Sequence, residues 1–501
     1  MKALLIQNSS AHLAARVVSL AAGLVAIPLV TMTLGMEALG LLGVYATLQG
    51  MLGLFDLGLP IAVNHQLAVL IGRKASSSSQ ASLIRSLEIL FWAMAAIFVS
   101  VGFLTAGPLA TSWLKINVLP REIVLTSLIL IIWSVAIRFP VAFYSNVLFG
   151  LGRHIYPNVV ITLSAVLRTA IAIVALVYLE VGLVGFFVIQ LIAGLAEVGL
   201  MALGVWYGAA HWAIRPKFTQ LREVRRMAGL LTAVSLTGVG LTQIDKIILS
   251  KIISLGDFGL YSAAYTLAAG LLALSYPVSN AIFPQLSQFF DQRRWDAAAR
   301  LIRLGSELTI LLVVPLGAVI TTQPEPALEV LFLGRPFPAE LVTILPWMLL
   351  GGIAQAFVTM PHMFRVASGQ PEAVLWINGI LLIPYGILIL VLANYYGVWG
   401  AAVAFAIFNI ARLSVHWIGL LANQPTAFAW RSSILQAIAT NLLSFGLAWC
   451  VTLLWSASKP TKIMLAALTV AGLFSLAAII LPSPRRHIIS RLRGAASLFF
   501  R

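Results

Sequence analysis

The stretch Ala38–Ala68 reads ALGLLGVYATLQGMLGLFDLGLPIAVNHQLA, and 219 residues later Asp257–Ser287 reads DFGLYSAAYTLAAGLLALSYPVSNAIFPQLS. The two stretches align without gaps and are identical at eight of 31 positions. Chance would give roughly three identities in a chain this rich in leucine and alanine. A later glycine recurs at a similar offset, since Gly152 corresponds to Gly369. These apolar segments indicate that the chain contains an internal duplication.

The composition indicates an integral membrane protein. Of the 501 residues, 60% are hydrophobic and 10% are charged, whereas a soluble domain is about 25% charged. Low charge and abundant glycine favour helices over a β-barrel. A hydropathy window predicts an all-α polytopic membrane protein with about 14 transmembrane helices, and six spans separate the two repeat copies. The copies therefore share one orientation, as in transporters with parallel repeats.

The predicted helices form two six-helix lobes related by the parallel repeat, followed by two extra C-terminal helices. The boundaries are 1–210 for the N-lobe (helices 1–6), 211–227 for a basic cytoplasmic linker, 228–421 for the C-lobe (helices 7–12), 422–481 for helices 13–14, and 482–501 for a basic cytoplasmic tail. The linker separates the two copies of the repeat, so we place the division of the chain there.

The distribution of lysine and arginine predicts the orientation. With a cytoplasmic N-terminus, the inner segments hold 21 of the 32 basic residues and the outer segments hold five. Basic residues concentrate in cytoplasmic loops, so we expect a multi-pass protein of the inner membrane with both termini cytoplasmic. The net charge of +16 then follows from these loops, and we expect no nucleic-acid partner.

Sequence signatures of enzymes and metal sites are missing. The seven histidines are scattered, and Cys450 is the single cysteine, so no metal-ligand spacing is present. The sequence has no phosphate-binding glycine loop followed by lysine. The outer loops are also too short to carry the catalytic groups of a membrane glycosyltransferase or polymerase. We therefore expect no catalytic residues, no cofactor and no metal.

Charged residues inside the predicted helices are the candidate site residues, because each is costly within a bilayer. The cations are Arg16, Arg138, Arg168, Lys246 and Arg412. They could line a polar cavity and bind substrate, or they could form structural pairs, with Glu197 as one possible partner. A net cationic cavity suits an anionic headgroup, because arginine donors grip phosphate oxygens in pairs.

Three acids accompany these cations: Asp56, Glu197 and Asp245. Each could bind a coupling ion or could neutralise a neighbouring cation, and for Asp245 we favour the structural role. Asp245 and Lys246 are adjacent in one predicted helix and point to different faces, so we expect no simple pair between them.

Several motifs resemble the polysaccharide-transporter family. They are FDLGL at Phe55–Leu59, QIDKIILSK at Gln243–Lys251, GDFGLYSAAY at Gly256–Tyr265 and FPQLS at Phe283–Ser287. This family of flippases for lipid-linked O-antigen and exopolysaccharide units belongs to the multidrug/oligosaccharidyl-lipid/polysaccharide exporter superfamily. The resemblance runs from about residue 10 to 421. It implies two lobes around a central cavity that opens alternately to each side, with no cofactor and no ATP hydrolysis.

The residues and the resemblance together favour a flippase. Its substrate would be an undecaprenyl-diphosphate-linked oligosaccharide, moved from the cytoplasmic to the periplasmic leaflet. Expected partners are this lipid-linked oligosaccharide, membrane lipid, and a polysaccharide polymerase with glycosyltransferases. One alternative is a cation-coupled multidrug exporter, although such exporters commonly carry an acid in the first helix, which this chain lacks. The other alternative is a peptidoglycan lipid flippase with the same lipid carrier.

Overall fold

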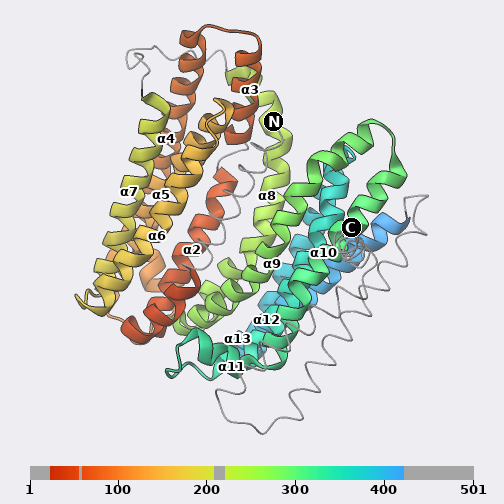
Figure 1. Cartoon of the computed structure of the whole chain (residues 1–501). Coiled ribbons are helices and arrows are strands. Elements are labelled where there is room, and N and C mark those ends of the chain that lie inside the picture. The colour runs from red at the N-terminus through yellow and green to blue at the C-terminus, as the bar shows by residue number, and fades with distance from the viewer. Residues whose placement is uncertain (1–22, 56–58, 208–220, 423–501) are drawn as a thin grey trace, which may run out of the picture. The chain divides into compact units, whose positions relative to one another are not determined.

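The computed structural model describes residues 23–55, 59–207 and 221–422, and this part of the chain is helical (Figure 1). A helix over Gly23–Leu34 precedes the labelled elements. These elements are α2 (Met36–Phe55), α3 (Leu59–Gly72), α4 (Ser77–Pro108), the π-helix η1 (Leu109–Trp113), α5 (Arg121–Gly150), α6 (Ile155–Val177), α7 (Leu183–Trp206), α8 (Leu221–Ile252), α9 (Leu255–Asp291), α10 (Trp295–Thr322), α11 (Pro324–Leu331), α12 (Glu340–Ala367) and α13 (Pro371–Ala422).

The prediction of an all-α polytopic membrane protein is confirmed. Eight helices of the described part are long and apolar enough to cross a membrane, and three shorter apolar helices accompany them. In that same part of the chain the backbone forms no strand, and Lys115 and Ser254 make an isolated β-bridge. α13 covers two of the predicted spans, which meet at Gly397, where the backbone is non-helical (φ 59°, ψ −142°). Helices 13–14 and the basic tail were predicted for residues outside the described ranges.

Backbone contacts divide the chain into two compact units. The first unit holds the described residues up to Ala263 together with Asn378–Gly397, and the second holds Ala264–Ile377 and the described residues from Val398 on. α8 and the beginning of α9 thus belong to the first unit. The lobe boundaries placed around the basic linker stay a prediction.

The turn between α3 and α4 recurs between α9 and α10. Lys74, two residues after the end of α3, has a left-handed backbone (φ 53°), and Arg293, two residues after the end of α9, has the same conformation (φ 54°). Each turn closes with the two backbone hydrogen bonds of a Schellman motif. These bonds run from Lys74 N–H to Ile71 O and from Ala75 N–H to Leu70 O in the first turn, and from Arg293 N–H to Phe290 O and from Arg294 N–H to Phe289 O in the second. Corresponding residues are 219 apart, which is the offset found in the sequence.

A second pair of turns repeats in the same manner. Gly152, two residues after the end of α5, has φ 76°, and Gly369, two residues after the end of α12, has φ 78°. Both positions need a left-handed backbone, which glycine adopts without steric cost. Arg153 N–H donates to Leu148 O in the first turn, and Gln370 N–H donates to Arg365 O in the second. The offset here is 217, so the second copy is two residues shorter between the two pairs of turns.

Within the first unit, the start of α2 packs against the start of α9 through corresponding glycines. A Cβ added to Gly40 would lie 2.1 Å from Leu255 O, and a Cβ added to Gly259 would lie 2.7 Å from Met36 O. Leu255 follows Met36 by 219 residues, and Gly259 follows Gly40 by the same number. The contact is therefore reciprocal, as expected when a pseudo-two-fold axis passes between the two helices. We call these four residues the glycine seam.

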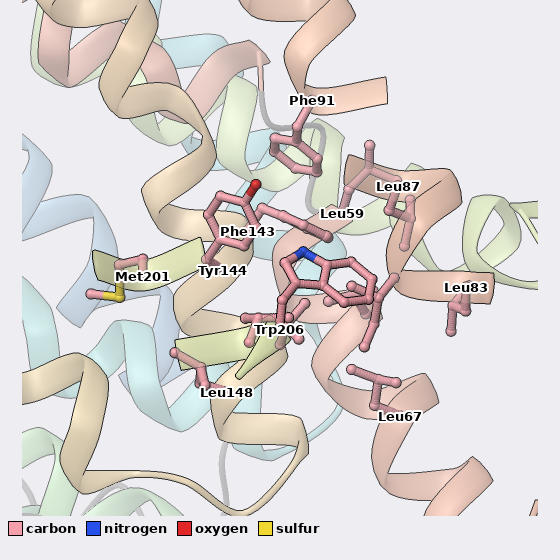
Figure 2. Packing of buried hydrophobic residues seen from close by; sticks show 14 of the residues in the cluster. Leu59, Leu67, Leu83, Leu87, Phe91, Phe143, Tyr144, Leu148, Met201 and Trp206 are labelled. Carbon is pink, nitrogen blue, oxygen red and sulfur yellow. The ribbon is translucent and has the colours of Figure 1, made fainter. Parts of the chain in front are cut away.

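The core of the first unit lies among α3, α4, α5 and α7. Leu67 of α3, Leu87 and Phe91 of α4, Phe143 of α5 and Met201 of α7 belong to one buried cluster, which Figure 2 shows from close by. Phe91 stacks on Phe143 with ring centroids 5.0 Å apart. Because lipid tails are as apolar as leucine, such interlocking contacts hold membrane helices together through close packing.

Candidate functional site

Arg138 and Glu197 form a buried ion pair in the first unit. The Arg138 Nη2 of α5 donates to Glu197 Oε2 of α7 at 2.5 Å, and the Glu197 side chain is 4% exposed. The other terminal nitrogen, Nη1, donates to the hydroxyl of Tyr45 on α2 at 3.4 Å. Gly194 lies one turn before Glu197, and a Cβ there would approach Arg138 Cγ to 3.1 Å. Three helices thus position one guanidinium, which is the structural pair considered from the sequence.

Arg168 adds a second guanidinium to this group. It is half-buried on α6 and interacts electrostatically with Arg138, Glu197 and Tyr45. It makes no hydrogen bond or ion pair with any residue that the structure describes. Two arginines and one glutamate leave the group with a net charge of +1. We call Arg138, Arg168, Glu197 and Tyr45 the Arg138 cluster.

The expectation that Asp245 and Lys246 would not pair is wrong. Lys246 Nζ lies 3.3 Å from both carboxylate oxygens of Asp245 and donates to Thr242 O at 2.7 Å. The lysine chain is long enough to bend back along α8, so the direction of its Cα–Cβ bond does not settle where the ammonium goes. Tyr261 Oη of α9 donates to Asp245 Oδ2 at 2.6 Å. Asp245 therefore neutralises a cation and ties α8 to α9.

Arg412 belongs to a basic group in the second unit. The buried His416 interacts electrostatically with Arg412, Arg365 and His362. Arg365 Nη2 of α12 donates to the backbone oxygen of His416 on α13 at 3.3 Å. The ring nitrogens of His416 are buried and have no hydrogen-bond partner among the described residues. Of this group, the sequence predicts only Arg412, and a histidine one turn later, His416, was the available signal for a second member.

Each repeat copy also contains a buried glutamate that was not among the predicted site residues. Glu88 of α4 accepts hydrogen bonds from Tyr144 Oη at 2.6 Å, Trp206 Nε1 at 3.0 Å and Arg85 Nη1 at 2.6 Å. Figure 2 shows the rings of Tyr144 and Trp206 beside the core of α4, α5 and α7. Glu307 follows Glu88 by 219 residues and accepts from Arg303 Nε at 2.8 Å. The two glutamates repeat at the offset of the duplication, and each has an arginine about one turn before it (Arg85 and Arg303), which was the available signal for both.

Two predicted site residues, Arg16 and Asp56, lie outside the described residues. Within the described ranges, no three or more histidine, cysteine, aspartate or glutamate side chains gather as a metal site would require. The structure therefore brings Arg138, Arg168 and Glu197 together, pairs Lys246 with Asp245, and places Arg412 in a separate basic group.

Apolar helices long enough to span a bilayer define a multi-pass membrane protein, and the charged side chains held among them mark its candidate functional site. The chain belongs to the polysaccharide biosynthesis protein family, whose model matches residues 5–290. A putative O-antigen transporter of Shigella flexneri is 20% identical over 377 residues, which cover 75% of this chain and 87% of the relative.

Solved structures share the fold at low sequence identity. The lipid II flippase MurJ in an inward closed conformation superposes with a TM-score of 0.74 and 13% identity, covering 97% of this chain and 100% of that chain. A multidrug resistance MATE family transporter of the MOP superfamily, in an inward-facing conformation, gives a TM-score of 0.65 and 15% identity over 83% of this chain and 94% of that one. This protein therefore has the MurJ/MATE-like fold.

Proposed function

We propose that this protein is a flippase for an undecaprenyl-diphosphate-linked oligosaccharide, an O-antigen or exopolysaccharide repeat unit. The substrate moves from the cytoplasmic to the periplasmic leaflet of the inner membrane, and both chain termini are cytoplasmic. The polar head cannot cross hydrocarbon unaided, because each unpaired polar group costs several kcal/mol there. The protein acts as a transporter and not as an enzyme, and it works beside a polymerase and glycosyltransferases.

The observation that supports this proposal is the net charge of the Arg138 cluster. Glu197 neutralises Arg138, so Arg168 remains as the guanidinium available to an anion. A diphosphate offers paired oxygens that match the planar donors of arginine. An exporter of cationic drugs would need a net negative charge at the Arg138 cluster. Membership of the polysaccharide biosynthesis family agrees with a substrate that carries phosphate and sugar.

Alternating access provides the mechanism. Two lobes, at 1–210 and 228–421, surround a cavity that opens first to one side and then to the other. The glycine seam lies where corresponding helices of the two repeat copies meet, so its glycines are suited to a contact that forms in one state and breaks in the other. The cations of the cavity hold the diphosphate while the lipid tail stays in the bilayer.

The decisive experiment follows lipid-linked oligosaccharide in a strain depleted of this protein. The strain is complemented with the wild type, with Arg168→Ala, or with Arg121→Ala as a matched control at an exposed arginine that begins α5. We expect the lipid-linked oligosaccharide to accumulate on the cytoplasmic leaflet after depletion. The wild type and Arg121→Ala should relieve the accumulation, and Arg168→Ala should not do so at equal membrane abundance.

Each other outcome argues for a different function. An absence of accumulation, together with new sensitivity to cationic drugs, would replace the proposal with a multidrug exporter. Accumulation of the peptidoglycan lipid precursor instead would assign the alternative lipid substrate. Relief by Arg168→Ala equal to that by the wild type would refute the role of the Arg138 cluster while leaving the flippase activity in place.

A further inference from the structure

A cavity of about 480 Å³ lies in the first unit where α5 turns into α6, beside the end of α7. Its lining includes Arg153, His154 and Tyr156 from the turn and the start of α6, Leu203 and Gly204 from α7, and Tyr207 directly after α7. We call it the turn pocket. It is separate from the Arg138 cluster, none of whose residues line it. The mixture of basic, aromatic and apolar side chains indicates a ligand that has both a charged and an apolar part.

Arg153 supplies the charge of the turn pocket. Its Nη1 donates to Gly204 O at 2.8 Å, which ties the guanidinium to the end of α7. No carboxylate pairs with Arg153 anywhere in the described part of the chain. The side chain is exposed, so its remaining N–H groups can bind an anion. His154 stacks on Phe149 with ring centroids 5.6 Å apart, which holds a second nitrogen donor beside Arg153.

Tyr156 lines one side of the turn pocket. Its hydroxyl donates to Leu200 O at 2.6 Å, and its ring covers Gly204, where an added Cβ would lie 2.2 Å from the ring. Glycine at position 204 is therefore required for the tyrosine to lie flat against α7. The ring is fixed at both ends, so the pocket is formed before any ligand arrives.

An apolar stripe continues from the turn pocket along α6. Ile155, Val159, Leu163 and Val166 are all exposed large hydrophobic residues. Their spacing of three or four residues places them on one face of the helix. Leu203 of α7 is also exposed beside the pocket. A hydrocarbon chain that lies on this stripe would reach the pocket with its polar end.

We propose that the turn pocket binds an anionic membrane phospholipid, with the phosphate on Arg153 and His154 and an acyl chain on the α6 stripe. Charge complementarity selects the anionic headgroup, since Arg153 has no carboxylate partner in the described structure and basic pockets between transmembrane helices bind acidic lipids. Tyr156 and Tyr207 suit the polar–apolar boundary, where tyrosine is enriched in membrane proteins. The proposal does not depend on the transported substrate.

The test measures lipid retention by the purified full-length protein. The protein is delipidated in detergent, incubated with phosphatidylglycerol and phosphatidylcholine of identical acyl chains, and analysed by native mass spectrometry. We expect the wild type to retain roughly fivefold more phosphatidylglycerol than phosphatidylcholine, which is the effect of one basic residue on the binding of an anionic headgroup. Arg153→Gln should abolish this preference, and Arg121→Gln, which removes an exposed arginine elsewhere, should keep it.

Two further variants distinguish the effects of the Arg153 charge and of the pocket volume from an effect of misfolding. Arg153→Lys keeps the positive charge and should keep most of the preference. Leu203→Trp leaves Arg153 intact but fills the turn pocket, so it should lower the retention of both lipids. Equal retention of the two lipids by the wild type, or an unchanged preference in Arg153→Gln, would overturn the proposal. If Arg153→Gln does not fold, full retention by Leu203→Trp would overturn it independently.

Discussion

The close contact at the glycine seam predicts that Gly40→Ala lowers the free energy of unfolding. In Gly40→Ala, the new Cβ would lie 2.1 Å from Leu255 O and 2.8 Å from Leu255 Cδ1. Carbon and oxygen atoms that are not bonded approach to about 3.3 Å. The backbones of α2 and α9 must therefore separate by about 1 Å. Overpacking of this size lowers the free energy of unfolding by about 1–3 kcal/mol.

Gly199→Ala is the matched control for this substitution. Gly199 lies inside α7, and an added Cβ would meet no atom within 4 Å. Alanine is the better helix former, so this control should raise the free energy of unfolding by about 0.5–1 kcal/mol. The measurement is the thermal and denaturant unfolding of each purified variant in one detergent. The free energy of unfolding of Gly40→Ala should therefore be clearly lower than that of the wild type, whereas that of Gly199→Ala should equal or exceed it.

The second glycine of the seam provides the internal check. Gly259→Ala should be destabilising as well, because its Cβ would lie 2.7 Å from Met36 O and 2.8 Å from Gly40 N. The double variant should lose less free energy of unfolding than the two single variants lose together, because one separation of α2 from α9 relieves both clashes. Strict additivity, or a Gly40→Ala variant as stable as Gly199→Ala, would refute the reasoning.

Three further predictions concern the buried charges. Glu197→Gln should lower the free energy of unfolding by about 3–5 kcal/mol, because it leaves Arg138 buried and uncompensated, and the double variant Arg138→Gln/Glu197→Gln should recover most of the loss in the same unfolding assay. Glu88→Gln weakens charged hydrogen bonds from Tyr144 and Trp206 and should cost about 1.5–3 kcal/mol, and an unaltered unfolding curve and near-UV circular dichroism spectrum would contradict this. Tyr261→Phe removes the hydrogen bond to Asp245 and should also cost about 1.5–3 kcal/mol, whereas Tyr265→Phe, on the same helix, should leave that bond intact.

The helical class and the duplication could be predicted because both depend on short-range properties. A span is recognised from the hydrophobicity of about 20 consecutive residues, and the offset of 219 residues was visible in the aligned stretches beginning at Ala38 and Asp257. The same offset reappears in the backbone of the turns at Lys74 and Arg293. The local sequence was sufficient here because each turn is closed by hydrogen bonds within six residues.

The candidate site was predicted only in part. Arg138, Arg168 and Glu197 were identified because a charge inside a span is costly wherever it lies. The hydropathy window predicts a span over about 84–107, so Glu88 lies close to its predicted beginning, where a charge is not conspicuous. The directions of the Cα–Cβ bonds predict no pair between Asp245 and Lys246, and this prediction is wrong because the lysine side chain is long enough to bend back to the carboxylate.

The sequence by itself therefore determined the class of protein, its repeat and some of the buried charges. Only the tertiary structure decided which charges meet. Arg138 and Glu197 are 59 residues apart, and Glu88 and Trp206 are 118 apart. Whether two such groups touch depends on how each helix is rotated about its axis, and this rotation is set by packing against helices distant in the chain. Hydrophobicity adds up along one segment, whereas an ion pair requires two segments to be placed together.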